Sequence, residues 1–274
     1  MSRRSAVTNV MVGAATKAAR GLRRDFGEVE QLQVSRKGPA DFVSTADHRT
    51  EKILYEELSR ARPDWSFLME ERGAVDAASG APGTPPGRWI VDPLDGTLNF
   101  LHGLPHFAIS IAAEERGQLT AAVVYDPIKD ELFWAEKGRG AYVNDARLRV
   151  SSRSALDDAV LATGIPFRGR KGHRQWLEEA ALLMGQVAGI RRFGSAALDL
   201  AYVAAGRYDG YWERNLNPWD VAAGVLLVKE AGGFVTDAEG RDRAMDGASV
   251  VCGTEGIHRA LLKALKTAGK TASA

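Results

Sequence analysis

The chain has 274 residues, of which 45% are hydrophobic and 26% are charged, a composition that is typical of a globular protein with a large core and that excludes a disordered chain. Its 36 Lys and Arg residues balance 35 Asp and Glu residues. The net charge therefore gives no sign of a polyanion-binding surface, and a nucleic-acid partner is not expected. The single cysteine, Cys252, can form neither an internal disulfide nor a cysteine-based metal site, which indicates a reducing cytoplasm.

The N-terminal quarter predicts two helices and one strand. Residues 6–24 carry small and apolar side chains at helical intervals and end in arginines, which suit a helix C-terminus. Polar residues interrupt this segment too often for a signal sequence, and no later run is long and apolar enough to span a membrane. A second helix is expected over 44–60, where Ser44 and Asp47 have capping-box spacing. Residues 65–69 predict a buried strand that ends at Glu70.

The rest of the chain divides into a strand-rich middle and a second half in which strands and helices alternate. Glycine and proline mark 74–87 as a surface loop. Strands are expected at 89–92, 106–113, 119–125, 131–135, 138–144 and 148–151, and then at 159–163, 190–193, 208–212, 233–236 and 249–252. Helices are expected at 174–187, 195–205, 219–230 and 255–265. This order predicts an α+β fold of layered sheets and helices, forming one domain over 1–266 with a disordered tail over 267–274.

Several familiar catalytic signatures are absent. The sequence has no dinucleotide-binding glycine motif, no P-loop and no Gly-x-Ser-x-Gly nucleophile elbow. His102 and His106 are four residues apart, but Gly103 and Pro105 between them exclude a zinc-binding helix. Neither a nucleophilic serine nor a histidine-rich metal site is therefore supported.

The remaining chemistry-bearing residues are carboxylates at the ends of apolar runs. In the segment from Asp92 to Thr97, a proline follows the first aspartate and is expected to end the strand and turn the backbone. The turn would bring Asp92, Asp95 and the Leu94 carbonyl together, with the N–H groups of Gly96 and Thr97 facing an anion. Oxygen ligands of this kind suit Mg²⁺. The alternative is an ordinary turn capped by Asp92.

Two further acids have similar settings. Glu70 follows an apolar strand, and Asp220 lies where a helix begins. Each also has a simpler interpretation, since Asp220 suits a helix cap and Glu70 suits a solvated loop.

The segment Asp92-Pro-Leu-Asp-Gly-Thr97 with Asn99-Phe100 resembles one signature of the inositol monophosphatase family, which comprises Mg²⁺-dependent, lithium-sensitive phosphatases. Trp219-Asp-Val-Ala-Ala-Gly224 with Glu230-Ala-Gly-Gly233 resembles the other signature. The resemblance extends over about residues 5–265. It implies a layered αβαβα sandwich and a homodimer.

The resemblance also implies a site. One Mg²⁺ would be held by Glu70, Asp92 and the Leu94 carbonyl, a second by Asp92, Asp95 and Asp220, and a third, weaker ion by Glu70 and water. Thr97, hydrogen-bonded to Asp47, would orient the attacking water, and this is compatible with a capping role of Asp47. Substrate contacts would come from Gly96, Thr97, Gly194, Ser195, Ala196 and Glu213, and Lys37 would sit on a mobile loop.

Three points stay open at this level. Glu213 would face the sugar hydroxyls, but it could instead pair with Arg214 or Arg191. The basic loop 167–171 could touch phosphate or be a solvated charge run. Met69 replaces the glycine that usually precedes the first glutamate of the family, so the Glu70 loop could be shifted or shielded and the third metal site altered.

The resemblance predicts a cytoplasmic enzyme that hydrolyses inositol monophosphate, a small phosphorylated polyol, with no membrane partner. Histidinol-phosphate phosphatase is the nearest alternative, followed by bisphosphate nucleotidase and fructose bisphosphatase. A different class of function is a regulatory partner of the transcription machinery with secondary catalysis.

Overall fold

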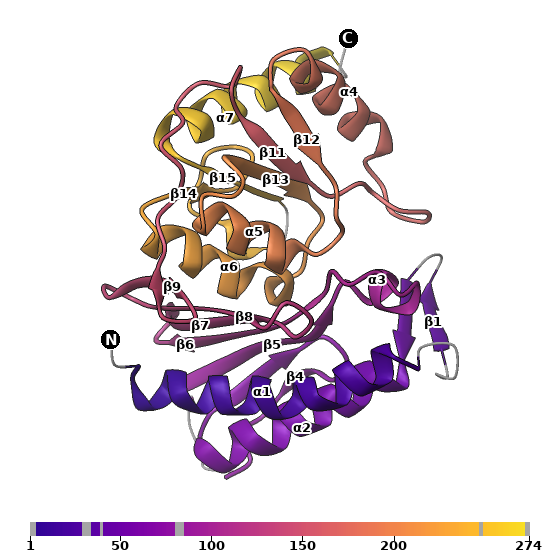
Figure 1. The fold of residues 1–274 in the computed structure, drawn as a ribbon, viewed down its shortest axis with the longest axis vertical. Coiled ribbons are helices and arrows are strands. Elements are labelled where there is room, and N and C mark those ends of the chain that lie inside the picture. Colours follow the sequence, from indigo (N-terminus) through magenta and orange to yellow (C-terminus); the bar gives the residue numbers. More distant parts are fainter. Residues whose placement is uncertain (1–3, 29–33, 39–40, 80–84, 247–248, 272–274) are drawn as a thin grey trace.

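Helices and sheets alternate in five layers along the long axis of the molecule (Figure 1). The computed structural model describes residues 4–28, 34–38, 41–79, 85–246 and 249–271. Two helices lie under an eight-stranded sheet, two more separate this sheet from a five-stranded one, and a last pair covers the outer face. The predicted α+β fold with αβαβα layering is confirmed.

The first layer consists of α1 (Ala6–Phe26) and α2 (Thr45–Ala61). Alanines line the buried face of α1, so that this helix packs closely on α2 and on the sheet. At the start of α2, Ser44 and Asp47 form the expected capping box. Both predicted helices are confirmed.

The eight-stranded sheet has the order β10-β9-β8-β7-β6-β5-β3-β4. Its strands are β3 (Ser66–Met69), β4 (Gly73–Val75), β5 (Gly87–Asp95), β6 (Ala108–Glu115), β7 (Gln118–Asp126), β8 (Glu131–Glu136), β9 (Gly140–Val143) and β10 (Ala146–Arg147). Helices cover both faces, which explains why the central strands are apolar almost throughout. The strand predicted at 148–151 is wrong. Strand β4 overlaps the start of the loop predicted at 74–87, because Gly73, at φ +69°, turns the chain back onto β3.

The proline after Asp92 predicted that the strand would end there, but β5 continues to Asp95. Asp92 pairs with Ser110 and Asp95 with Ala108, so three steps along β5 match two along β6. This extra residue is a β-bulge, a place where a proline is tolerated because the ladder is already interrupted. Beyond it, Gly96 at φ +93° starts the short helix α3 (Thr97–Leu101), which the sequence pattern did not predict.

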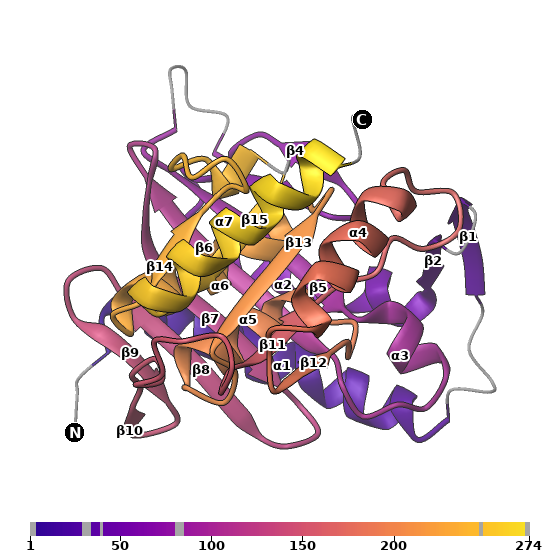
Figure 2. The same cartoon turned by 90° about the horizontal axis from the view of Figure 1, so that it is seen from above.

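The second half builds the upper layers (Figure 2). Helices α5 (Ala196–Ala204) and α6 (Pro218–Glu230) lie between the sheets, and every residue of α5 is buried. The five-stranded sheet has the order β12-β11-β13-β15-β14 and comprises β11 (Val160–Thr163), β12 (Gly189–Arg191), β13 (Gly210–Arg214), β14 (Phe234–Thr236) and β15 (Ser249–Gly253). Helices α4 (His173–Met184) and α7 (Glu255–Thr271) cover its outer face.

Helix α7 extends through Thr271, which corrects the predicted tail from 267 onwards. Burial of Ala264, Leu265 and Ala268 stabilises the last turns of this helix, and Ala268 is only 4% exposed. Residues 272–274 lie outside the described part of the chain. The extent of the single domain, 1–266, stays a prediction.

Two small elements complete the fold. Strands β1 (Val34–Gly38) and β2 (Asp41–Ser44) form an antiparallel hairpin, and a 3₁₀ turn spans Ala244–Asp246. Lys37 lies on β1, and its side chain is outside the described part. Every helix within the described ranges is too short or too polar to cross a bilayer.

Candidate active site

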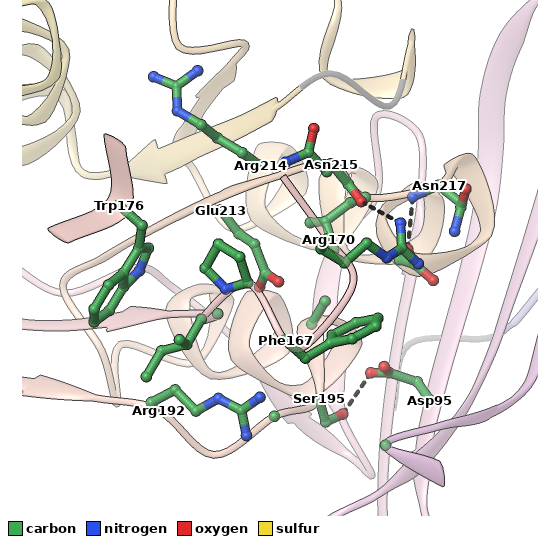
Figure 3. A pocket seen from close by; sticks show the side chains of 18 of the residues that line it. Asp95, Phe167, Arg170, Trp176, Arg192, Ser195, Glu213, Arg214, Asn215 and Asn217 are labelled. Atoms are coloured by element: carbon green, nitrogen blue, oxygen red, sulfur yellow. Dashed lines mark hydrogen bonds between the residues drawn. The ribbon is translucent and has the colours of Figure 1, made fainter. Parts of the chain in front are cut away.

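One pocket collects residues from both halves of the chain around about 1320 Å³ of open space, its mouth included. Nine of the predicted site residues line it, namely Glu70, Asp95, Gly96, Thr97, Gly194, Ser195, Ala196, Glu213 and Asp220. Asp47, Asp92 and Leu94 are buried behind this wall. Figure 3 shows the Ser195–Asp95 hydrogen bond at one end of the pocket, Trp176 at the other, and Glu213 between them.

Four carboxylates gather at the first end of the pocket. Asp92, 2% exposed, lies at the β5 bulge, where its Oδ1 accepts the Leu94 N–H at 2.9 Å. Burial raises the pKa of Asp92 well above its usual value, and the charges of Glu70, Asp95 and Asp220 raise it further. The four acids therefore lie close enough to repel one another, and ionising all of them requires positive charge between them.

Glu70 reaches this group from β3. Its backbone N–H continues the ladder to β5 by donating to the Val91 carbonyl at 3.2 Å. Met69 is fully buried in the core against α1 and α2. Because side chains alternate along a strand, the Met69 side chain points away from the pocket. It therefore does not shield Glu70.

Asp220 comes from the first turn of α6, where its Oδ2 accepts the Asn217 N–H at 2.6 Å. It is thus the third residue of a capping box whose cap is Asn217, and not the cap itself. Burial raises the pKa of Asp220, and the charges of Asp95, Glu70 and Glu213 add to this.

Asp95 joins the two halves of the molecule. Its Oδ2 accepts the Ser195 hydroxyl at 2.5 Å and the Ala197 N–H at 2.8 Å, both from the start of α5. Burial raises the pKa of Asp95 to about 6 in spite of these donors. Oδ2 is thus held by α5, while the charge of Asp95 raises the pKa values of Asp92 and Asp220.

Asp47 and Thr97 form the predicted pair. Asp47 Oδ2 accepts the Ser44 N–H at 2.8 Å and the Ser44 hydroxyl at 2.6 Å, while Oδ1 is 3.0 Å from the Thr97 hydroxyl. The Thr97 hydroxyl is also 3.0 Å from the Leu94 carbonyl, so these two acceptors share its one proton. One carboxylate therefore both caps α2 and orients Thr97.

Glu213 lies on β13 and accepts the Tyr211 hydroxyl at 2.5 Å. Burial raises its pKa to about 7, while the positive charges of Arg192 and Arg170 oppose that rise. The alternative pairing is wrong, because Arg214 binds Glu179 at 2.8 Å and Arg191 donates to the Ile190 carbonyl. Neighbouring residues of a strand face opposite sides, which separates Glu213 from Arg214.

Sequence reasoning missed part of the pocket wall. Arg192, Trp176 and Asn215 line it, and no motif marked them. Phe167 and Arg170 of the basic loop also reach the wall, where the Arg170 guanidinium lies 4.9 Å from the Phe167 ring centroid. Arg168 instead faces solvent.

The donor set has the chemistry of a site for a hard cation. All four gathered side chains are carboxylates, and the carbonyl of Leu94, the residue before Asp95, accepts the Thr97 hydroxyl of the pocket wall. Within the described ranges, no group of three or more His, Cys, Asp or Glu side chains is already arranged to hold a metal ion. The residues present nonetheless fit Mg²⁺, since its charge would offset the repulsion that raises their pKa values.

Comparison with known proteins shows the family of the chain. The model of the inositol monophosphatase family matches residues 3–270. The chain belongs to the inositol monophosphatase family. It is therefore an enzyme of the inositol-1-monophosphatase-like phosphoric monoester hydrolases.

Individual relatives match over nearly their whole length. Inositol-1-monophosphatase of Rhizobium meliloti is 57% identical over 263 residues, which cover 96% of this chain and 97% of the relative. The Nus factor SuhB of Pseudomonas aeruginosa is 43% identical and covers 94% of this chain and 95% of its own. The crystal structure of the extragenic suppressor protein suhB from Bartonella henselae has a TM-score of 0.91 at 57% identity, covering 96% of this chain and 99% of that one.

Proposed function

We propose that this family member is a Mg²⁺-dependent phosphomonoesterase that hydrolyses inositol monophosphate to inositol and phosphate. The observation that carries the proposal is how charge is distributed along one pocket: four mutually repelling carboxylates gather at one end, Asp92 behind its wall, and Glu213 lies further along the wall. Members of the family generally depend on a metal ion.

The proposed metal ligands are shared among three ions. Glu70, Asp92 and the Leu94 carbonyl would hold one Mg²⁺, and Asp92, Asp95 and Asp220 would hold a second. Glu70 and water would hold a third. When bound, Mg²⁺ supplies Lewis-acid charge that activates water and stabilises the departing alkoxide.

The protein's own groups orient the attacking water. The Thr97 hydroxyl donates its proton to Asp47 or to the Leu94 carbonyl, so its lone pairs point toward the pocket to accept from a water molecule. Asp47 holds the threonine rotamer because two donors of Ser44 fix the other carboxylate oxygen. Glu70, at the pocket surface, completes the proposed catalytic group and helps to hold that water. Positioning of this kind carries most of the rate when the phosphoryl transition state is loose.

The alcohol part of the substrate would meet the other half of the chain. Glu213 would accept hydrogen bonds from two hydroxyls of the polyol, with Gly194, Ser195 and Ala196 beside it. The backbone N–H groups of Gly96 and Thr97 would face the phosphate. Lys37, which lies on β1, would belong to the mobile metal-binding segment.

Replacement of Gly164 tests the role of Glu213. A Cβ at Gly164 would overlap the Glu213 carboxylate, so Gly164→Ala is expected to push this side chain aside and to raise KM for inositol 1-phosphate about tenfold. Gly185→Ala is the matched control, because a Cβ there meets no atom within 4 Å. Steady-state kinetics of both variants decide the matter, and an unchanged KM in Gly164→Ala would remove Glu213 from the substrate site.

A substrate panel tests the function itself. Phosphate release is measured from inositol 1-phosphate, histidinol phosphate and adenosine 3′,5′-bisphosphate, each with Mg²⁺ and with EDTA. The highest kcat/KM is expected for inositol 1-phosphate, and only with Mg²⁺. Preference for histidinol phosphate would reassign the substrate within the same chemistry, and no Mg²⁺-dependent release from any of the three would refute the proposal.

The family resemblance supports further properties of the proposed enzyme. These are inhibition by lithium, a cytoplasmic location and a homodimeric state, which inhibition assays, cell fractionation and light scattering test in turn. The name of the Pseudomonas relative, a Nus factor, also keeps a role in the transcription machinery as a second candidate.

A further inference from the structure

Asn99, on the short helix α3, holds three backbone carbonyls with one side chain. Its amide nitrogen lies 2.8 Å from the carbonyl oxygen of His106, 2.7 Å from that of Phe193 and 3.4 Å from that of Gly194. The residue is 6% exposed, so water does not compete for these contacts. Asn99 belongs neither to the proposed metal ligands nor to the residues that line the pocket.

The acceptors lie on two sides of the molecule. His106 leads into β6 of the eight-stranded sheet, whereas Phe193 and Gly194 connect β12 of the other sheet to α5. A primary amide has two hydrogens. One of them fixes the amide to its own half by the bond to His106, and the other is thereby aimed across to Phe193.

The segment held in this way is the proposed substrate wall. Gly194, Ser195 and Ala196 line the pocket directly after Phe193. Gly194 has φ +85°, a left-handed conformation that glycine adopts because it has no Cβ. The far end of the segment is held by Asp95 through Ser195 and Ala197.

Two residues four positions apart in one motif therefore clamp both ends of the wall. Asp95 holds the start of α5 and also acts electrostatically on the other acids, whereas Asn99 binds the loop before α5 and the His106 carbonyl.

We propose that Asn99 is a positioning residue that sets the alcohol-binding wall against the phosphate-binding end and thereby determines selectivity for the alcohol. This inference rests on the proposed phosphomonoesterase function. Loss of the amide lets the 193–194 loop move while the carboxylates keep their places. Binding of the alcohol then weakens, and the chemical step at phosphorus is retained.

The test compares two substrates in the full chain. For Asn99→Ala, KM for inositol 1-phosphate is expected to rise about tenfold, which corresponds to the loss of one to two hydrogen bonds. Its kcat is expected to stay within about threefold of the wild-type value. The leaving group of phenyl phosphate has no hydroxyls for the wall to bind. The KM for this substrate is therefore expected to change less than about threefold. The KM of Asn99→Ser, which keeps one hydrogen-bond donor, is expected to lie between those of Asn99→Ala and the wild type.

Asn144→Ala is the matched control. The Asn144 side chain accepts the Leu132 N–H at 3.0 Å and donates to the Asp130 carbonyl at 3.3 Å, within a β-hairpin that does not line the pocket. It is expected to lower Tm without changing the ratio of kcat/KM between the two substrates. The half-saturating Mg²⁺ concentration is expected to stay unchanged in all three variants.

Equal loss on both substrates in Asn99→Ala and Asn99→Ser, or loss of the folded state in both, would show a purely structural role and overturn the inference. An altered Mg²⁺ requirement with an unchanged substrate ratio would also overturn it, since Asn99 would then act through Asp95. A wild-type enzyme without turnover of any phosphomonoester would instead refute the proposed function. The two failures are therefore distinguishable.

Discussion

Replacing Asp92 by Asn is expected to lower kcat for Mg²⁺-dependent phosphate release by about 10³-fold and, at the same time, to raise the Tm of the metal-free protein by a few degrees. Asp92 is the proposed ligand shared by two ions, so its loss weakens both. Without metal, its buried charge is repelled by Glu70, Asp95 and Asp220, and a neutral amide of the same shape removes that repulsion. A site that is strained for function thus limits the stability of the fold.

Asp209→Asn provides the contrast. Asp209 is equally buried, but it accepts the Val160 N–H at 2.7 Å and pairs with Arg153 at 3.3 Å. Its replacement is expected to lower Tm and to leave kcat within about twofold. Thermal unfolding in EDTA and phosphate-release kinetics measure both effects, and a lower Tm in Asp92→Asn would contradict the repulsion argument. If Asp92→Asn still complements a deletion strain, the main role of the protein lies outside catalysis.

The stabilising effect of Mg²⁺ is expected to grow with pH, reaching about 5–10 °C in Tm near pH 8 at roughly one hundred times the dissociation constant. The sign follows from the acids. The pKa of folded Asp95, about 6, is raised above its usual value, so its contribution to stability is present below about pH 4 and is lost as pH rises through about 6. The raised pKa values of Asp92 and Asp220 extend this loss to higher pH.

Mg²⁺ binds the ionised carboxylates and therefore offsets the loss where it is largest. Thermal unfolding with Mg²⁺ and with EDTA at pH 5, 6.5 and 8 measures the difference in Tm. The Asp92→Asn protein is expected to show a smaller and flatter difference. A difference that is absent at pH 8, or that shrinks as pH rises, would rule out these acids as the metal site.

The sequence contained the individual parts of the site. Capping-box spacing identified Ser44 and Asp47, apolar runs ending in Glu70 and Asp92 identified two acids, and a predicted helix start identified Asp220, because each pattern reflects local backbone geometry. The family signatures supplied the grouping of these acids, which spacing by itself does not provide.

Contacts between distant segments could not be read in this way. Residue spacing does not show whether Glu213 pairs with Arg214 or faces the pocket. The position of β13 in its sheet decides this, because the two side chains diverge there and Arg214 pairs with Glu179. The same holds for Arg192, which sequence reasoning left out, and for Asn99, which belongs to a recognised motif without an assigned role. Their partners lie on elements that only folding brings near.

By itself, the sequence determined the α+β layering, the positions of most helices and strands, and the carboxylate chemistry of the site. Burial follows the local period of apolar residues, and ligand type follows from side-chain chemistry. Only the tertiary structure decided that β5 bulges through Pro93 instead of ending, that Asp95 bonds across to α5, and that Asn99 spans the two halves. These features depend on register and on long-range pairing, which a one-dimensional pattern does not encode.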